Sequence, residues 1–249
     1  MRLGRGPLPR PITKSSKPAY NKFMHADLLA AVRAYQMPEA AVELLKANPP
    51  LILAAVSAAG KDTIAKYVIE HSDYRRSISH TTRPMRAGEE NGVDYWFVTE
   101  AEMLELISHQ ALIETQAVHG ETVYGSSLAA YQQVVADGHR PLLIMDIQGV
   151  DKLTRRLPSL RPYFILPPSY EEWLHRLAKR GSMGAGEKTR RLASARKEIE
   201  YVLRQPHFHL VVNREVPVAA AEILSGRPGP AAESNRALAH DLLNRLKTG

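Results

Sequence analysis

Short apolar runs alternate along this chain with longer segments whose apolar residues recur every three or four positions. The short runs predict strands, at residues 51–56, 95–98, 112–118, 141–147, 162–166 and 209–213. The longer segments predict amphipathic helices, at residues 64–70, 100–110, 127–137, 169–180 and 187–204. Strands that alternate with helices in this way are typical of a mostly parallel sheet covered by helices, which is the α/β class.

Further helices are predicted outside this alternating region. Two short amphipathic segments precede it, at 26–35 and 38–47, and Pro38 is suited to the start of the second. We expect both to pack on the core, with a contact between two copies of the chain as the alternative. After Ser225, a linker-like stretch with two prolines leads to a final amphipathic helix at 235–247.

The charge is concentrated at the N-terminus. The 249 residues have a formal net charge of +7, and residues 1–23 contain six lysines and arginines but no acidic residue, so about +1 is left for the rest. A nearly neutral core does not favour binding to nucleic acid, which usually needs a strongly basic face. Residues 1–23 also contain four prolines, and we expect a basic disordered arm there.

The composition narrows the class of protein in two further ways. There is no cysteine, so neither a disulfide framework nor a thiolate metal site can form. The histidines are scattered along the sequence, and we expect no metal site made of protein ligands alone. No apolar run approaches the roughly eighteen residues that a membrane span requires. We therefore expect a cytoplasmic protein without membrane association, either a monomer or a homodimer.

The stretch Ser77–Val98 has the composition of a cup for a small anion. Arg83 and Arg86 carry forked guanidinium groups that suit a phosphate, and Ser79 and Tyr95 add hydroxyl groups. Two glycines allow the loop to turn back on itself. The alternative is an ordinary solvated loop with basic side chains.

A second anion site is predicted upstream, where the apolar run 51–56 ends in S-A-A-G-K-D-T before a helix. On such a turn, backbone N–H groups and the helix N-terminus converge on one anion. The match to the phosphate-binding loop G-x-x-x-x-G-K-[ST] is imperfect, because Ala55 stands at the first glycine and Asp62 at the hydroxyl residue. A Gly-Lys pair in an ordinary turn is the alternative. Two phosphate sites in one chain suggest a donor and an acceptor.

Four strings carry a resemblance to a known family, namely T-T-R-P-M-R-A-G-E-x-x-G-x-D-Y, E-T-Q-A-V-H-G-E-T-V-Y-G-S, M-D-I-Q-G-V and R-L-A-K-R-G. In this order, from about Leu51 to Val216, the chain resembles guanylate kinase. The resemblance implies a three-layer α/β fold of the P-loop NTPase type, with a parallel sheet flanked by helices, a GMP-binding subdomain and a lid. The expected organisation is a basic arm at 1–23, a helical extension at 24–49, a kinase domain at 50–224 with its GMP-binding region at about 77–130 and its lid at about 180–190, and a linker and helix at 225–249.

The activity that the resemblance implies is ATP-dependent phosphorylation of GMP, or of dGMP, to the diphosphate, with Mg²⁺ accompanying ATP. The residues that it assigns to catalysis are Lys61, Arg176, Arg180 and Arg191. Those that it assigns to ATP are Ser57, Ala58, Ala59, Gly60, Lys61, Asp62, Thr63 and Asn213. Those that it assigns to GMP are Ser79, Arg83, Arg86, Tyr95, Glu114, Tyr124, Ser126 and Asp146. The metal would be bound together with the ATP phosphates, and the resemblance assigns Asp62 and Thr63 to it.

Acidic side chains are chemically suited to recognise the guanine base. Guanine presents N1–H and an exocyclic amino group as adjacent donors, which one carboxylate can accept together, whereas adenine presents an acceptor at N1. The resemblance assigns Glu114 and Asp146, with Ser126 beside them, to the guanine. The alternatives are an acid at a strand edge for Glu114 and a magnesium-coordinating acid for Asp146.

Three positions depart from the family pattern. Asp62 replaces a hydroxyl residue, Ile144 replaces the first acid of a D-x-D arrangement, and the loop 119–125 is one residue longer before Tyr124. Asp62 could bind magnesium more strongly than a hydroxyl group does, or it could repel the phosphates of the donor. The neighbouring Thr63 could then supply the hydroxyl group in its place.

Two rival functions remain open. A phosphate-loop kinase with a ribose bisphosphate acceptor also uses Gly-Lys-Asp. A non-enzymatic guanylate-kinase-like module retains the acceptor cup and binds phosphopeptides. Lys61 and the lid arginines favour an enzyme, and the pair Glu114 and Asp146 favours guanine as the acceptor base.

Overall fold

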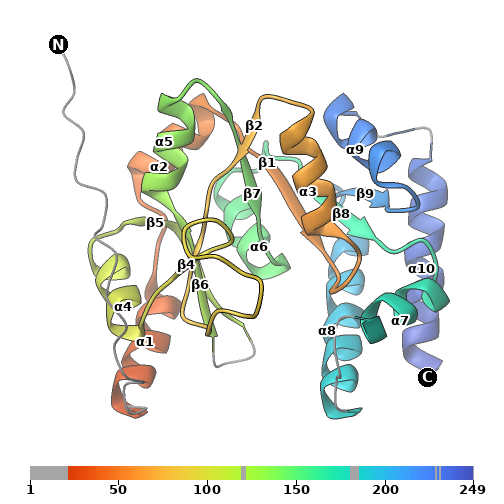
Figure 1. Ribbon diagram of the computed structural model, residues 1–249, viewed down its shortest axis with the longest axis horizontal. Helices are drawn as coiled ribbons and strands as arrows, with labels where there is room; N and C mark the ends of the chain where they lie inside the picture. Colours follow the sequence, from red (N-terminus) through yellow and green to blue (C-terminus); the bar gives the residue numbers. More distant parts are fainter. Residues whose placement is uncertain (1–21, 119–121, 180–184, 228, 230, 249) are drawn as a thin grey trace.

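The structure, a computed structural model, describes residues 22–118, 122–179, 185–227, 229 and 231–248. In this part of the chain, the central sheet has five strands, all parallel, in the order β2-β7-β1-β8-β9. Their bounds are β1 Leu51–Ala55, β2 Tyr74–Arg76, β7 Arg140–Ile144, β8 Tyr163–Leu166 and β9 His209–Val212. The central strands are apolar on both faces because helices cover both faces of the sheet (Figure 1), which confirms the predicted α/β class.

A second, mixed sheet lies beside the first (Figure 1). Its order is β4-β3-β6-β5, with bounds β3 His80–Thr81, β4 Trp96–Phe97, β5 Leu112–Val118 and β6 Thr122–Ser127. β6 runs antiparallel to both β3 and β5. The runs at 95–98 and 112–118 were therefore rightly predicted as strands, but they belong to this smaller sheet and not to the parallel one.

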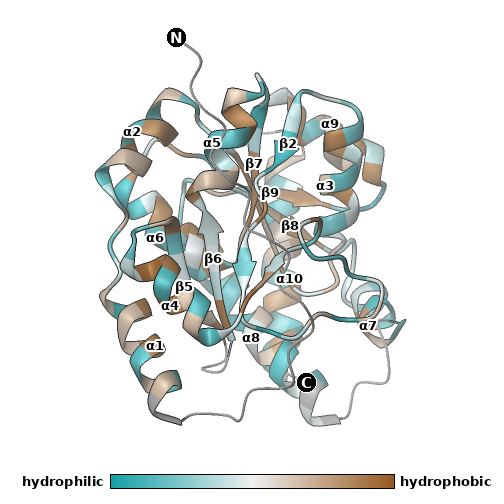
Figure 2. Ribbon diagram, turned by 60° about the vertical axis from the view of Figure 1, so that its left-hand side comes forward, coloured by the Kyte–Doolittle hydropathy of each residue, from teal (hydrophilic) through white to brown (hydrophobic). Residues whose placement is uncertain are grey.

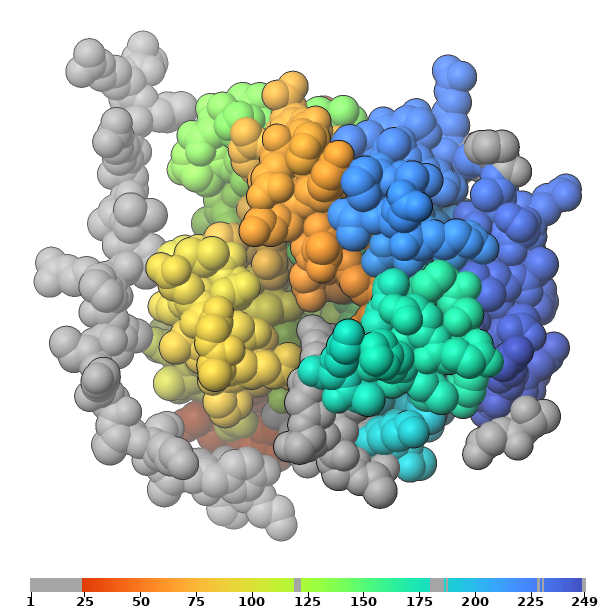
Figure 3. All heavy atoms as spheres, turned by 45° about the vertical axis from the view of Figure 1, so that its right-hand side comes forward, coloured from red at the N-terminus to blue at the C-terminus, as the bar shows by residue number. Residues whose placement is uncertain are grey.

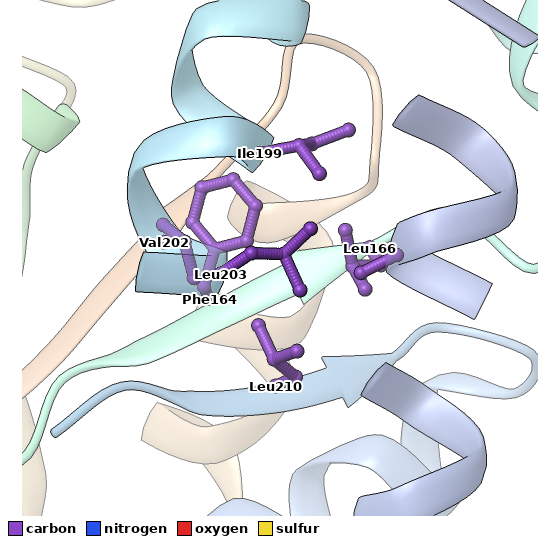
Figure 4. A pocket seen from close by; sticks show the side chains of 7 residues that line it. Phe164, Leu166, Ile199, Val202, Leu203 and Leu210 are labelled. Atoms are coloured by element: carbon purple, nitrogen blue, oxygen red, sulfur yellow. The ribbon is translucent and has the colours of Figure 1, made fainter. Parts of the chain in front are cut away.

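The helices that connect or follow the strands complete the core. They are α3 Lys61–Glu70, α4 Glu100–Ser108, α5 Leu128–Ala136, α6 Ile147–Arg156, α7 Tyr170–Lys179, α8 Ala185–Arg204 and α9 Val216–Ser225. Most of the main strands are coloured as apolar in Figure 2, whereas β6 is close to neutral. Phe164 of β8 and Leu210 of β9 point toward Ile199 and Leu203 of α8 (Figure 4), and these side chains leave no space for even a water molecule.

The predicted terminal helices are present as α1 Lys22–Ala34, α2 Glu39–Ala47 and α10 Ala232–Thr248. α1 packs on α4 and β5 of the smaller sheet, α2 contributes to the main core, and α10 packs along α8 and β9. Within the described ranges, no helix combines the length and apolarity that crossing a bilayer would require.

Several segments differ from the sequence prediction. The strand predicted at 141–147 ends at Ile144, because Asp146 caps helix α6 and draws Ile147 into its first turn. Residues 122–125, interpreted as part of a loop, belong to β6, which extends to Ser127, so the helix predicted from 127 begins at Leu128. Helices α6 and α9 and the short strands β2 and β3 were not predicted. The arm was expected to end at 23, but α1 begins at Lys22. Residues 1–21 of the arm and 180–184 of the expected lid lie outside the described residues.

Candidate active site

The predicted donor loop connects β1 to α3 at the carboxyl edge of the parallel sheet, where α/β proteins commonly bind ligands. Gly60 has φ +94°, and a Cβ added there would lie 2.2 Å from the side-chain amide nitrogen of Asn213. That nitrogen donates to the Ala59 carbonyl at 2.8 Å. This close approach explains why position 60 needs glycine. It also places Asn213, which is far away in the sequence and was predicted to bind ATP, against the loop.

Side chains from α7 and α8 hold the same loop. Trp173 Nε1 donates to the Ser57 carbonyl at 2.8 Å, and Arg191 Nη1 donates to Ser57 Oγ at 3.1 Å. Arg176 Nη1 lies 3.9 Å from the position that a Cβ on Gly60 would take. Two of the three predicted lid arginines are thus at the loop. The third, Arg180, lies outside the described residues.

Ala58 has φ +64°, a left-handed conformation that costs a residue with a Cβ about 1 to 2 kcal/mol. Glycine avoids this cost but loses about 0.5 to 1 kcal/mol of backbone entropy on folding. We predict that Ala58→Gly raises the free energy of unfolding by up to about 1 kcal/mol, measured by urea denaturation. Ala55→Gly is the control, because Ala55 lies in β1 without a positive φ and should be destabilised by the same change.

The predicted acceptor cup is assembled around Arg83. Its Nε donates to the Tyr124 hydroxyl at 3.2 Å, and its two terminal nitrogens donate to Glu89 at 2.7 and 2.6 Å. The guanidinium carbon lies 5.1 Å from the centre of the Tyr95 ring. The side chain of Arg83 is only 9 % exposed, so its fork is fixed in place. Tyr124, Tyr95 and Arg83 are therefore brought together as predicted.

Glu89 was not predicted as a site residue. Besides the fork of Arg83, it accepts the backbone N–H of Arg86 at 2.8 Å, and the hydrogen bond from Arg83 is the main cause that lowers the pKa of Glu89. The signal in the sequence is the first acid of the Gly-Glu-Glu turn six residues after Arg83. Ser79 is buried at the base of this region, and the Arg86 side chain is exposed.

Glu114 and Ser126 lie together in the smaller sheet. Ser126 Oγ donates to Glu114 Oε1 at 2.8 Å, whereas Glu114 Oε2 is buried without a hydrogen-bond partner. Burial is the main cause that raises the pKa of Glu114 to about 7, and the charge of Asp146 adds to it. A buried acceptor without a partner is costly. The arrangement therefore fits a ligand that brings its own donor.

Asp146 follows the end of β7 by two residues and is the N-cap of α6. Its Oδ1 accepts the backbone N–H groups of Gln148 at 2.9 Å and Gly149 at 3.1 Å. A Cβ added to Gly149 would lie 3.1 Å from Glu114 Oε2. The absence of a side chain there keeps space open beside the two carboxylates.

The two predicted anion sites lie near each other. Burial is the main cause that raises the pKa of Asp146, and the charge of Lys61, at the start of α3, opposes it. Burial is also the main cause that raises the pKa of Tyr95, and the charge of Asp62 adds to it. In Figure 3 the yellow loop that carries Arg86 and the teal helix α7 lie on opposite sides of the lower end of the orange α3. Residues of the donor loop thus lie close enough to residues of the predicted GMP site for their charges to interact.

A further acid in this region was missed by sequence reasoning. Glu198 on α8 is half-buried and accepts a hydrogen bond from Ser194 Oγ at 2.9 Å. Burial raises the pKa of Glu198 to about 7, and the charge of Asp146 contributes. Nothing in the helical pattern of α8 marks this residue, because it resembles an ordinary acid on an amphipathic helix.

The donor set at the loop suits a hard cation that arrives with a nucleotide. Among the described residues no group of three acidic or histidine side chains could hold a metal on its own. Asp62 and Thr63 offer a carboxylate and a hydroxyl in the first turn of α3. Mg²⁺ is usually held by one or two such oxygens together with phosphates and water.

A parallel sheet with a strand-loop-helix phosphate site at its carboxyl edge defines the P-loop class of α/β proteins. Within that class, the guanylate kinase family model matches residues 47–223, and the chain belongs to that family. The match leaves out α1 and α10 and most of α2.

Individual relatives agree with the family model. The chain is 36 % identical to a guanylate kinase of Leifsonia xyli over 74 % of this chain and 73 % of the relative. It is 39 % identical to one of Syntrophotalea carbinolica, over 70 % and 82 %. The crystal structure of guanylate kinase from Anaplasma phagocytophilum matches with a TM-score of 0.56 and 28 % identity, over 74 % of this chain and 88 % of that one.

Proposed function

We propose that this protein transfers the γ-phosphoryl group of ATP to GMP, or to dGMP, and releases ADP and the guanosine diphosphate. The observation that carries the proposal is the buried Glu114 oxygen without a partner, in a chain that also has the phosphate loop and the cup around Arg83. The guanylate kinase relatives support the same reaction.

On the donor side, the backbone amides of residues 57–63 and the N-terminus of α3 bind the ATP phosphates. Lys61 reaches the β and γ phosphates and offsets the charge that spreads over the transferring group. Arg176 and Arg191 add positive charge from α7 and α8, and we assign the same role to Arg180. Asn213 shapes the loop through its bond to Ala59.

On the acceptor side, the GMP phosphate binds between the hydroxyls of Ser79, Tyr95 and Tyr124 and the guanidinium groups of Arg83 and Arg86. Glu89 holds the fork of Arg83 in advance, at 2.6 and 2.7 Å. Such preorganisation reduces the entropy lost when the phosphate binds. The two phosphates can then approach in line, which is most of what phosphoryl transfer requires of a protein.

Guanine binds against the two carboxylates. Glu114 accepts N1–H and the exocyclic amino group, Ser126 fixes the carboxylate through its 2.8 Å hydrogen bond, and Asp146 completes the acidic wall. Adenine offers an acceptor where guanine has N1–H and leaves Glu114 without a partner. The selection of base is therefore electrostatic and geometric, and does not depend on the size of the ring.

Mg²⁺ bound with ATP would neutralise the β and γ phosphates, and Asp62 and Thr63 are the residues that would hold it. Because the substrates are ATP and GMP, we place the protein in the cytoplasm, where both are made and used. We assign no nucleic-acid partner to the core and leave the choice between monomer and homodimer to gel filtration.

A coupled assay of ADP release tests the proposed reaction directly. With magnesium and ATP, we expect turnover with GMP and dGMP and little with AMP or UMP. Turnover with ribose 1,5-bisphosphate in place of GMP would support the first rival function. GMP binding without any turnover would support the second, a binding module.

GMP affinity should fall as the pH falls below 7. Only the ionised Glu114 accepts both guanine donors, and its pKa is about 7, so each unit of pH below this value should raise the Kd for GMP by up to about tenfold. Calorimetric titrations on either side of pH 7 measure the effect. Glu114→Gln is the control, because it keeps the titration of the GMP phosphate and loses that of the carboxylate. An equal pH dependence in both proteins would contradict the assignment.

A further inference from the structure

The hydroxyl of Tyr35 binds both backbone groups of one residue at the start of β5. It donates to the Leu112 carbonyl at 2.5 Å and accepts the Leu112 N–H at 3.3 Å. Tyr35 directly follows α1, and the two residues lie 77 positions apart in the chain. The family match begins at residue 47, so this contact comes from a segment outside it.

The strand pairing is irregular directly after Leu112. Leu112 pairs with Ser127, but Thr115 pairs with Gly125, so β5 has one residue more than β6 in this interval. Ile113 and Glu114 together therefore face Ser126. An extra residue of this kind bends the strand and redirects side chains. Here both side chains are buried, and that of Glu114 reaches Ser126 Oγ at 2.8 Å.

Tyr35 is itself held firmly from both sides. Before it, Leu28 and Val32 of α1 are buried against Met103, Leu112 and Val123. After it, Val42 and Leu45 of α2 are buried in the core of the parallel sheet. The segment between the two helices thus has little freedom, and the hydroxyl is fixed at the strand. Burial is the main cause that raises the pKa of Tyr35, and the charge of Glu114 contributes, so the two groups interact.

We propose that Tyr35 is a positioning residue for guanine recognition, which fixes the irregular start of β5 so that the carboxylate of Glu114 meets the base. The inference rests on the proposed function, because it assumes that Glu114 reads guanine. Tyr35 itself does not touch the substrate. It acts on the backbone two residues before Glu114, and without its hydroxyl the strand can shift and the carboxylate loses its alignment.

The test compares Tyr35→Phe with Tyr131→Phe. Tyr131 on α5 donates its hydroxyl to the Asn48 carbonyl, so this control removes a similar bond between the helical extension and the core without touching the backbone of Leu112. We expect Tyr35→Phe to raise the KM for GMP about five- to tenfold, as for one lost hydrogen bond. The preference for GMP over inosine monophosphate, which lacks the amino group, should fall by a similar factor. The KM for ATP should stay unchanged, and Tyr131→Phe should alter neither nucleotide constant.

Both variants are assayed at a temperature at which circular dichroism shows them folded. A wild-type protein without GMP turnover would remove the proposed function and this inference with it. An active wild type with an unchanged GMP constant and purine preference in Tyr35→Phe would overturn the inference alone. Equal effects in both variants would also overturn it, because they would indicate a general loss of stability.

Discussion

Replacing Lys61 with alanine should lower kcat for GMP phosphorylation by about 10²- to 10³-fold, while the Kd for GMP stays within about twofold. Lys61 is the first residue of α3, and its charge acts on Asp146. We assign it to the charge that develops on the transferring phosphoryl group, where a single donor has its largest effect. Steady-state ADP release gives kcat, and calorimetry gives the Kd for GMP.

The matched control is Lys66→Ala on the same helix. The side chain of Lys66 is 77 % exposed and lies 3.9 Å from Glu70, so its loss should leave kcat unchanged. A Lys61→Ala protein that retains most of its turnover would contradict the assignment of the donor site. Loss of GMP binding together with turnover would indicate that the loop had lost its shape, because Lys61 belongs to the donor side.

Glu114→Gln should lower kcat/KM for GMP by about 10- to 100-fold, equivalent to about 1 to 3 kcal/mol. Glutamine has nearly the same shape, but its amide presents a donor to a base that already offers two donors. One of these donors is then left buried without a partner. Turnover with AMP should not fall by the same factor, so the ratio of the two substrates is the informative quantity.

The same variant should be more stable than the wild type at alkaline pH. The pKa of Glu114 rises from 4.5 to about 7 on folding, so its contribution to stability is fully present below 4.5 and is lost as the pH rises through 7. Glutamine removes this loss. Glu198→Gln is the control, because its pKa is also raised to about 7. It should share the gain in stability and leave purine preference unchanged. A Glu114→Gln enzyme with wild-type preference would remove Glu114 from base recognition.

Much of the fold could be predicted because its strongest signals are continuous apolar runs and apolar residues at helical spacing. The buried run L-I-L-A-A and the amphipathic patterns of α7 and α8 each reflect a single physical requirement, namely burial on a sheet or on one helix face. The end of β7 could not be found in this way, since Met145 and Ile147 continue the apolar run. Only the capping bonds of Asp146 reveal the change to helix.

The smaller sheet was harder to predict. β3 and β4 are two residues long, too short for any period, and β6 reads T-V-Y-G-S-S, which resembles a turn. The sheet depends on the pairing of β3 with β6 and on the packing of α1 against β5, both of which join segments that lie far apart in the sequence. The position of Tyr35 was invisible for the same reason.

The site residues that sequence reasoning found are those whose chemistry is local. Arg83, Arg86 and the Gly-Lys turn stand out in short strings, and the structure brings Arg83 close to Tyr95 and Tyr124. Glu89 was missed because its role depends on Arg83, and the raised pKa of Glu198 was missed because it depends on what packs around that helix. An acid in a loop and an acid on a helix look ordinary until the partner is known.

Recognition of guanine by Glu114 is tested by a pair of calorimetric titrations of the purified protein at slightly alkaline pH, one with GMP and one with AMP. We expect saturable heat with GMP and an affinity for AMP weaker by at least about tenfold, because adenine leaves the buried Glu114 oxygen unsatisfied. Equal affinity for the two nucleotides, or no heat with GMP, would contradict this assignment.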